Sequence, residues 1–211
     1  KIMKKHITII DYGSGNILSA KQSFLKVIEK NKLNAEVSIS GTSKSISEST
    51  HLVLPGQGAF ETCINGLKEI PGMLDELSNF ALIKKKPFFG ICVGMQLLAD
   101  SSYENGNHRG LGWISGTIEK LPSKQLKMPH MGWNSIKVVN SNSGILIKEK
   151  DYYFVHSYYF NCKNSENVVA ETTYGINFPS IVRKENIYGT QFHPEKSSHQ
   201  GLDIIKNFIE L

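Results

Sequence analysis

Three short apolar segments, each followed by a glycine-containing turn, most constrain the fold of this chain. Residues 6–10, 52–54 and 88–91 are apolar and too short to form independent helices, which is typical of buried strands. Between residues 17 and 28, apolar side chains recur every three or four positions, which predicts a helix against the sheet. Because alternating strands and helices connect by right-handed crossovers, we expect an α/β fold with a mostly parallel central sheet flanked by helices.

The second half of the chain has a different pattern, because turns and few helices separate its apolar segments. This pattern predicts an antiparallel part added to the parallel sheet. In this half, strands are expected at residues 114–121, 134–139, 152–155, 168–173 and 187–191. In the first half, a further weak strand is expected at residues 36–39. Further helices are expected to start near Ala59, Met73 and Met95, and a last one to cover residues 202–209.

The length and composition favour one domain. The chain has 211 residues, 40% of them apolar, and a domain usually takes roughly 100–200 residues. We expect a single domain over residues 4–211, with residues 1–3 as a terminal remnant. No apolar run approaches the roughly 20 residues of a membrane-spanning helix, and residues 7–10 are too short for a signal-peptide core. We therefore expect a cytoplasmic protein with no membrane partner.

The charged residues and cysteines exclude several classes of partner and cofactor. The net charge of +5 is spread along the chain without interleaved aromatic residues, so we expect no nucleic-acid binding. Cys63, Cys92 and Cys162 are far apart and form no paired motif, so neither a disulfide framework nor a zinc site is expected. Gly13 and Gly15 lack the third glycine of a dinucleotide fingerprint. We expect no metal and no cofactor, but one of the thiols can still be a nucleophile.

Cys92 lies at the centre of Gly-Ile-Cys-Val-Gly, residues 90–94, between an expected strand and an expected helix. A nucleophile on such a sharp turn needs small residues two positions away on either side. The turn presents the side chain at the carboxyl edge of the sheet, and a helix N-terminus there favours a thiolate. We interpret Cys92 as a nucleophile, and the alternative is a buried structural cysteine.

A base for this thiol is present in Gln-Phe-His-Pro-Glu, residues 191–195. Pro194 stiffens the link, so His193 and Glu195 can point to the same side and the carboxylate can orient the imidazole. Alone, His193 would be an ordinary turn residue and Glu195 a surface residue. Together with Cys92, they favour a catalytic triad for nucleophilic catalysis.

A glycine-rich turn provides the third part of the predicted site. Pro-Gly-Gln-Gly, residues 55–58, follows a strand and leads into a helix, so its backbone N–H groups can face an anion. One of them can stabilise a tetrahedral oxyanion beside the N–H of Val93. The alternative is an ordinary strand-to-helix turn.

These segments together resemble the class I, or triad, glutamine amidotransferases, which have a flavodoxin-like fold and hydrolyse glutamine to glutamate and ammonia with a Cys-His-Glu set. The resemblance narrows to the glutaminase subunits of imidazole glycerol phosphate synthase. The Pro-His-Met-Gly-Trp-Asn segment discriminates best within the class. The matching segments are residues 11–16, 90–96, 129–134, 154–158 and 191–197.

The resemblance implies a role for each residue of the site. Cys92 would be the nucleophile that forms a γ-glutamyl thioester, His193 the general base and acid, and Glu195 the group that orients it. The resemblance further implies that the turn at residues 55–58 would flip a peptide before a donor faces the oxyanion, so hydrolysis would depend on a partner. The oxyanion and substrate would be bound by Val93, Gly56, Gln57, Gly58, Gln96, Ser157 and Tyr158.

The resemblance also implies a heterodimer with a (βα)8-barrel cyclase, which uses ammonia from L-glutamine to make imidazole glycerol phosphate and aminoimidazole carboxamide ribotide in histidine biosynthesis. Met131, Trp133, Asn134 and Lys196 would lie at the interface, around the mouth where ammonia crosses. A docked barrel must seal this exit, and exposed Trp and Met are typical interface anchors. The alternative for Trp133 is core packing, and His156 is expected to be structural.

Three other interpretations stay open. The same glutaminase could serve a barrel homologue that delivers ammonia to another acceptor. The chain could be an inactive scaffold that only regulates the barrel, although intact Cys92, His193 and Glu195 argue against this. A cysteine peptidase of related fold is the third, although the setting of its base and acid is not expected to match residues 191–197.

Overall fold

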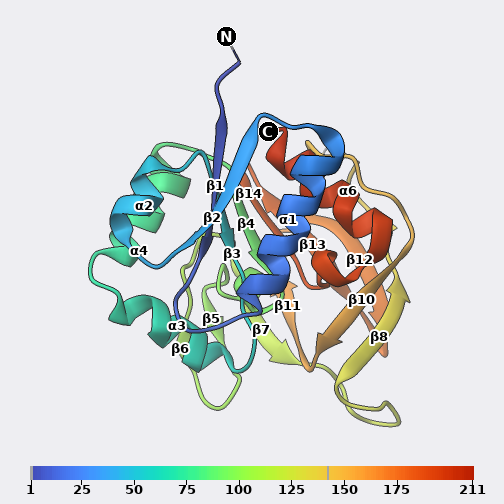
Figure 1. Cartoon of the computed structure of the whole chain (residues 1–211). Coiled ribbons are helices and arrows are strands. Elements are labelled where there is room, and N and C mark those ends of the chain that lie inside the picture. Colours follow the sequence, from blue (N-terminus) through green and yellow to red (C-terminus); the bar gives the residue numbers. More distant parts are fainter. Residues whose placement is uncertain (1, 142) are drawn as a thin grey trace.

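The computed structural model describes residues 2–141 and 143–211, and within them an eight-stranded sheet forms the centre of the molecule (Figure 1). Lys1 of the expected terminal remnant lies outside the described residues, and the domain limits of 4–211 stay a prediction. In sheet order the strands are β2 (Ala35–Ser40), β1 (Lys5–Ile10), β3 (His51–Leu54), β4 (Phe88–Ile91), β14 (Ile187–Thr190), β13 (Ile176–Lys184), β12 (Val168–Tyr174) and β9 (Lys137–Val138).

The sheet changes from parallel to antiparallel at β14. β1 pairs in parallel with β2 and β3, β3 with β4, and β4 with β14, whereas β13 runs antiparallel to both β14 and β12. This confirms the predicted parallel sheet with an added antiparallel part. Every residue of β3, β4 and β14 is buried, because helices cover both faces of these strands.

Two groups of helices lie on either side of the sheet (Figure 1). α1 (Ile17–Asn31) and α6 (Ser198–Ile209) lie side by side, and α2 (Ser43–Glu48), α3 (Phe60–Glu69) and α4 (Met73–Ser78) lie on the other side. Phe208 of α6 packs against Phe24 of α1 and Phe89 of β4, with ring centroids 6.5 and 5.2 Å apart. These rings join both helices to the sheet. No described helix is long and apolar enough to cross a membrane.

Within the described residues, two smaller sheets lie beside the main one, and they were only partly predicted. β8 (His130–Ser135) pairs antiparallel with β10 (Asp151–His156). β7 (Gly116–Lys120) pairs with β11 (Tyr158–Cys162) and β5 (Ser101–Ser102), and β5 pairs with β6 (His108–Arg109). Ser157 therefore lies where the chain passes from one small sheet to the other.

Several elements differ from the sequence-based expectation. The expected strand at residues 134–139 is two strands, β8 and β9, which belong to different sheets. β13 was missed because Pro179 interrupts its pattern, although Pro179 pairs with Glu171 in the sheet at a point where the register shifts nearby. The helix expected from Met95 is the four-residue α5 (Val93–Gln96), which starts earlier and ends sooner.

Candidate active site

Cys92 sits on a strained turn between β4 and α5. Its backbone has φ +54° and ψ −113°, which is rare for a residue with a side chain. A Cβ on Gly90 would lie 2.6 Å from the Gly94 carbonyl oxygen, and one on Gly94 would lie 1.9 Å from the Leu54 carbonyl oxygen. The turn therefore requires the small residues that its pattern predicted. Because α5 has only one turn, stabilisation of a thiolate depends on its first N–H groups and on neighbouring side chains.

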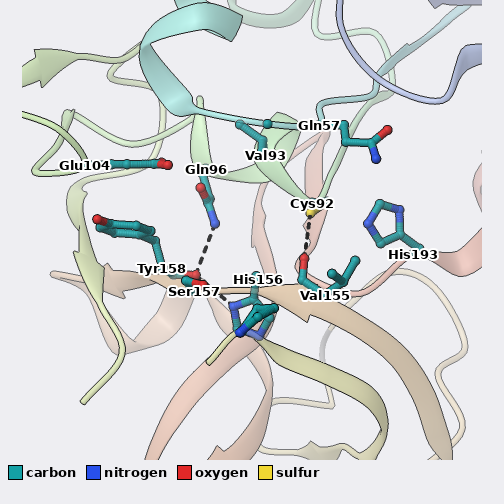
Figure 2. A pocket seen from close by; sticks show the side chains of 12 residues that line it. Gln57, Cys92, Val93, Gln96, Glu104, Val155, His156, Ser157, Tyr158 and His193 are labelled. Carbon is teal, nitrogen blue, oxygen red and sulfur yellow. Dashed lines mark hydrogen bonds between the residues drawn. The ribbon is translucent and has the colours of Figure 1, made fainter. Parts of the chain in front are cut away.

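His193 lies between Glu195 and Cys92. Its Nδ1 is 2.6 Å from Oε1 of Glu195, and the side chains are only 7% and 4% exposed. A carboxylate can only accept, so the hydrogen sits on Nδ1. Figure 2 shows the imidazole facing the sulfur of Cys92, to which Nε2 is free to bond.

The surroundings favour a charged His193. Burial lowers the pKa of the imidazole, but hydrogen bonds and charges from Cys92 and Glu195 outweigh this effect and raise the pKa of His193 to about 10. An opposite charge and a hydrogen bond both favour the protonated form. The pair is therefore suited to keep a proton on the imidazole while the sulfur carries negative charge.

Gln191 was not predicted as a site residue, but it lies against Cys92. Its Nε2 is 3.8 Å from Sγ of Cys92, and its Oε1 accepts a hydrogen bond from Nε2 of Gln96 at 3.1 Å. The other hydrogen of Gln96 Nε2 points to the Tyr158 carbonyl, 3.2 Å away. Gln96 thus uses its amide donors on the protein and orients Gln191. The signal in the sequence was the position of Gln191, two residues before His193.

The glycine-rich turn at residues 55–58 is held by the loop that follows β1. The Ser14 hydroxyl donates to the Gln57 carbonyl at 2.8 Å and accepts from the Gln57 N–H at 3.3 Å. The Tyr12 hydroxyl donates to the Pro55 carbonyl. In this arrangement the N–H of Gln57 is committed to Ser14. The peptide between residues 56 and 57 must rotate before this donor can face an oxyanion.

A cavity of about 310 Å³ opens beside Cys92 (Figure 2), near the lower end of the roughly 300–1,000 Å³ typical of small-molecule sites. The structure brings together at its wall the predicted residues Gln57, Gly58, Cys92, Val93, Gln96, Ser157, Tyr158 and His193. Residues of the wall that were not predicted to bind substrate are Glu104, Pro129, Val155 and His156. Gly56 packs behind the wall, where a Cβ would lie 2.5 Å from the Gly94 nitrogen.

Glu104 is the one carboxylate in the described wall of this cavity. Its Oε2 accepts a hydrogen bond from the Phe60 N–H at 3.2 Å, and desolvation raises its pKa. The side chain points toward the cavity from the side opposite His193 (Figure 2). Nothing in the sequence around Glu104 distinguished it from a surface acid in a turn.

The residues predicted for a partner interface lie outside the cavity wall. Met131 and Trp133 of β8 are 60% and 54% exposed, so the alternative that Trp133 packs in the core is wrong. Trp133 packs edge to face against Tyr153, with ring centroids 6.1 Å apart. Asn134 is half-buried, and Lys196 is exposed immediately after Glu195. Among the described residues, no cluster of His, Cys, Asp and Glu side chains could hold a metal ion.

The chain belongs to the class-I glutamine amidotransferases, because residues 8–211 match the family described as "Glutamine amidotransferase class-I". A solved structure titled "Crystal structure of glutamine amidotransferase" has the same fold, with a TM-score of 0.72, 18% identity and 97% of each chain covered. A glutamine amidotransferase from Thermotoga maritima gives a TM-score of 0.65 at 18% identity, over 99% of this chain and 82% of that one.

Within this class, the chain belongs to the HisH subunits of imidazole glycerol phosphate synthase, so it is an enzyme subunit. It is 47% identical to "Imidazole glycerol phosphate synthase subunit HisH" of Pelagibacter ubique, over 98% of this chain and 100% of the relative. The HisH subunit of Rhodospirillum rubrum is 42% identical over 96% and 97% of the two chains. "HisH 2" of Methanococcus maripaludis is 42% identical over 97% and 98%. The family resemblance inferred from the motifs is confirmed.

Proposed function

We propose that this chain hydrolyses L-glutamine to L-glutamate and ammonia with Cys92, His193 and Glu195 as a catalytic triad. The observation that carries the proposal is the position of His193, whose Nδ1 is held by Glu195 at 2.6 Å while the ring faces Cys92 at a cavity. This is the arrangement that nucleophilic catalysis requires: a nucleophile, a base and a group that orients the base.

In the proposed reaction, the thiolate of Cys92 attacks the side-chain amide carbon of glutamine. The tetrahedral oxyanion is stabilised by the Val93 N–H and, after rotation of its peptide, by the Gln57 N–H. His193 gives its proton to the leaving nitrogen, the C–N bond breaks, and ammonia and a γ-glutamyl thioester form. Water then attacks the thioester, His193 takes a proton from it, and glutamate leaves with the thiolate restored.

The cavity wall offers complementary groups to the main-chain end of free glutamine. The carboxylate of Glu104 is an acceptor for the α-ammonium group, with which it forms a charge-assisted hydrogen bond. The backbone at Ser157 and Tyr158 faces the α-carboxylate. Gln96 acts on this segment through its bond to the Tyr158 carbonyl. The substrate side chain then reaches from Glu104 toward Cys92.

We propose further that the ammonia passes directly to a (βα)8-barrel cyclase bound as a heterodimer. The relatives from Pelagibacter ubique and Rhodospirillum rubrum are each named as a subunit of imidazole glycerol phosphate synthase. Exposed Met131 and Trp133 lie on β8, which pairs with β10, and β10 supplies Val155 to the cavity wall. A barrel docked over Trp133, Asn134 and Lys196 would exclude water from the exit. The cytoplasmic location expected from the sequence stays a prediction.

The test is the Cys92→Ala variant assembled with the cyclase subunit. We expect it to lose synthesis of imidazole glycerol phosphate from glutamine and to keep synthesis from added ammonium salt, because ammonia then bypasses the triad. Cys162→Ala is the matched control, since its thiol lies away from the cavity, and should keep both reactions. Loss of the ammonium reaction in Cys92→Ala would give Cys92 a different role.

A second experiment separates the alternatives. The electrophile 6-diazo-5-oxo-norleucine should label the wild-type chain once, at Cys92, and should not label Cys92→Ala. An inactive scaffold would remain unlabelled. If the unlabelled wild-type enzyme makes glutamate with a homologous barrel and not with the histidine-pathway cyclase, the acceptor of the ammonia is a different one.

A further inference from the structure

Two buried histidines face each other beside the cavity, outside the proposed triad. His130 of β8 and His156 of β10 are direct partners in the strand register, and they are 4% and 6% exposed. Nδ1 of His130 lies 2.8 Å from Nε2 of His156. Neither ring is used in the reaction proposed above, although His156 lines the cavity.

The partners at the two ends determine where the hydrogens are. Nδ1 of His156 is 2.8 Å from the Tyr158 carbonyl, which can only accept, so this nitrogen carries a hydrogen. In the neutral ring, Nε2 of His156 is then an acceptor, and Nδ1 of His130 must donate to it. Nε2 of His130 in turn accepts from Nδ2 of Asn134 at 3.1 Å. The second hydrogen of Asn134 Nδ2 is bound by the Thr173 carbonyl at 3.0 Å.

Aromatic rings hold His130 in this orientation. It stacks on Tyr174 and Phe154, with centroids 4.2 and 4.9 Å apart and interplanar angles of 24° and 29°. Phe178 packs edge to face against both histidines, with its ring centroid 5.8 Å from that of His130 and 5.0 Å from that of His156. The rings therefore cannot turn to exchange their nitrogens without disturbing this packing.

The same surroundings disfavour a charge on either histidine. Burial lowers the pKa of His130 to about 4 and that of His156 to about 3. The titratable side chains that face His156 are His130 and His193, and a positive charge on either of them lowers the pKa of His156. No carboxylate of the described residues forms an ion pair with either ring. Both rings are therefore neutral at physiological pH. The donor and acceptor assignments given above require the same protonation state.

We propose that Asn134, His130 and His156 form a hydrogen-bond relay that positions the Tyr158 carbonyl in the substrate-binding wall. In this relay each side chain donates a hydrogen bond to the next group, and the last acceptor is the Tyr158 carbonyl. Tyr158 C=O accepts from His156 Nδ1 and from Gln96 Nε2, at 2.8 and 3.2 Å, so the relay also sets the position of Gln96. The three side chains are positioning residues, and this role rests on the proposed glutaminase function. The relay connects the exposed strand of Met131 and Trp133 to the wall that holds glutamine.

The hydrogen positions are tested directly by two-bond ¹H–¹⁵N correlation spectra of the histidine rings in the wild-type chain. Both His130 and His156 should be neutral, with hydrogen on Nδ1, at pH 7. In Asn134→Asp the new carboxylate can only accept, so His130 should gain a hydrogen on Nε2 and become an imidazolium. Hydrogen on Nε2 of either ring in the wild-type chain, or an unchanged His130 in Asn134→Asp, would overturn the relay.

The positioning role is tested by steady-state glutamine hydrolysis in the assembled complex with the cyclase subunit. His130→Phe keeps a ring to stack on Tyr174 and Phe154 but removes both hydrogen bonds. Its KM for glutamine should rise about tenfold, the effect of one lost hydrogen bond, with kcat within about twofold. Tyr174→Phe keeps the ring and loses only its bond to the Lys127 carbonyl, and it should retain the wild-type KM.

A rescue variant separates hydrogen bonding from packing. In His130→Asn the amide nitrogen takes the place of Nδ1 and can still donate to His156, so KM should return toward the wild-type value despite the lost stacking. A wild-type KM in folded His130→Phe, or a KM in His130→Asn no better than in His130→Phe, would overturn the relay. A wild-type complex that hydrolyses no glutamine would instead refute the proposed function, while the spectra would still decide the hydrogen positions.

Discussion

Glu195 binds His193 with one carboxylate oxygen and leaves the other unpaired. Oε1 lies 2.6 Å from Nδ1 of His193, whereas the buried Oε2 has no hydrogen-bond partner among the described residues. A buried carboxylate with a single partner interacts mainly with that partner. The charge of Glu195 is therefore available to raise the pKa of His193, and its removal should act on the imidazole first.

We expect Glu195→Gln to lower glutaminase activity at least about a hundredfold, which is within the usual range for general acid–base catalysis. The wild-type pKa of about 10 keeps the proton on His193 below that pH, so activity should fall on the alkaline side. Without the carboxylate the pKa is lower, so this alkaline limb should move to lower pH. Initial rates between pH 6 and 11, read as a property of the Cys92–His193 pair, measure the shift; an alkaline limb at unchanged pH would contradict it.

Ser14→Ala should raise basal hydrolysis of glutamine by the isolated chain several-fold. The Ser14 hydroxyl holds both the N–H and the carbonyl of Gln57, so its removal releases the peptide that must rotate to complete the oxyanion site. Net hydrogen-bond contributions of about 1 kcal/mol each support an effect of this size. Ser47→Ala, which loses a surface bond to the Lys44 carbonyl, is the control. A lower basal rate in Ser14→Ala would mean that Ser14 supports the active turn.

Gly94→Ala should destabilise the fold by about 3 kcal/mol or more, because the added methyl group collides with backbone. The new Cβ would lie 1.9 Å from the Leu54 carbonyl oxygen. Gly13→Ala is the matched control, since Gly13 has φ +84° with nothing within 4 Å of an added Cβ, and it should cost only about 1 kcal/mol. Urea unfolding of both variants compares the two costs. Equal stabilities would mean that the turn at Cys92 tolerates a larger residue.

Trp133→Ala should weaken binding of the cyclase subunit about 30-fold, as expected when an interface anchor of about 2 kcal/mol is lost. Trp133 is 54% exposed and contacts Tyr153 on the neighbouring strand. The variant should also release more glutamate per imidazole glycerol phosphate formed, because ammonia escapes at a poorly sealed exit. Leu18→Ala, at an exposed apolar residue of α1, should change neither the dissociation constant nor this ratio. Wild-type affinity in Trp133→Ala would place the cyclase elsewhere.

The central sheet and the turn at Cys92 were predictable because both depend on local patterns. Residues 52–54 and 88–91 had to be buried strands, and the glycines around Cys92 leave room for its turn. The contact between His193 and Glu195 was predictable because only Pro194 separates them and it restricts the link. These features need no information from distant parts of the chain.

The rest of the wall depends on contacts between segments far apart in the sequence. Glu104 meets the cavity only because its turn folds back over α3, and Gln191 reaches Cys92 across 99 residues. His130 and His156 are neighbours through the β8–β10 register, which the single expected strand at residues 134–139 did not represent. Contacts of this kind follow from tertiary packing, and local patterns do not specify which distant residues meet.

The most direct test of the proposed glutaminase function is glutamate release from glutamine by this chain, measured alone and then with the cyclase subunit and its nucleotide substrate. Because Ser14 holds the N–H of Gln57, we predict a low basal rate that rises steeply when both are added and that disappears in Cys92→Ala. No glutamate release by the folded chain in the presence of the cyclase subunit and nucleotide would contradict the proposed glutaminase function.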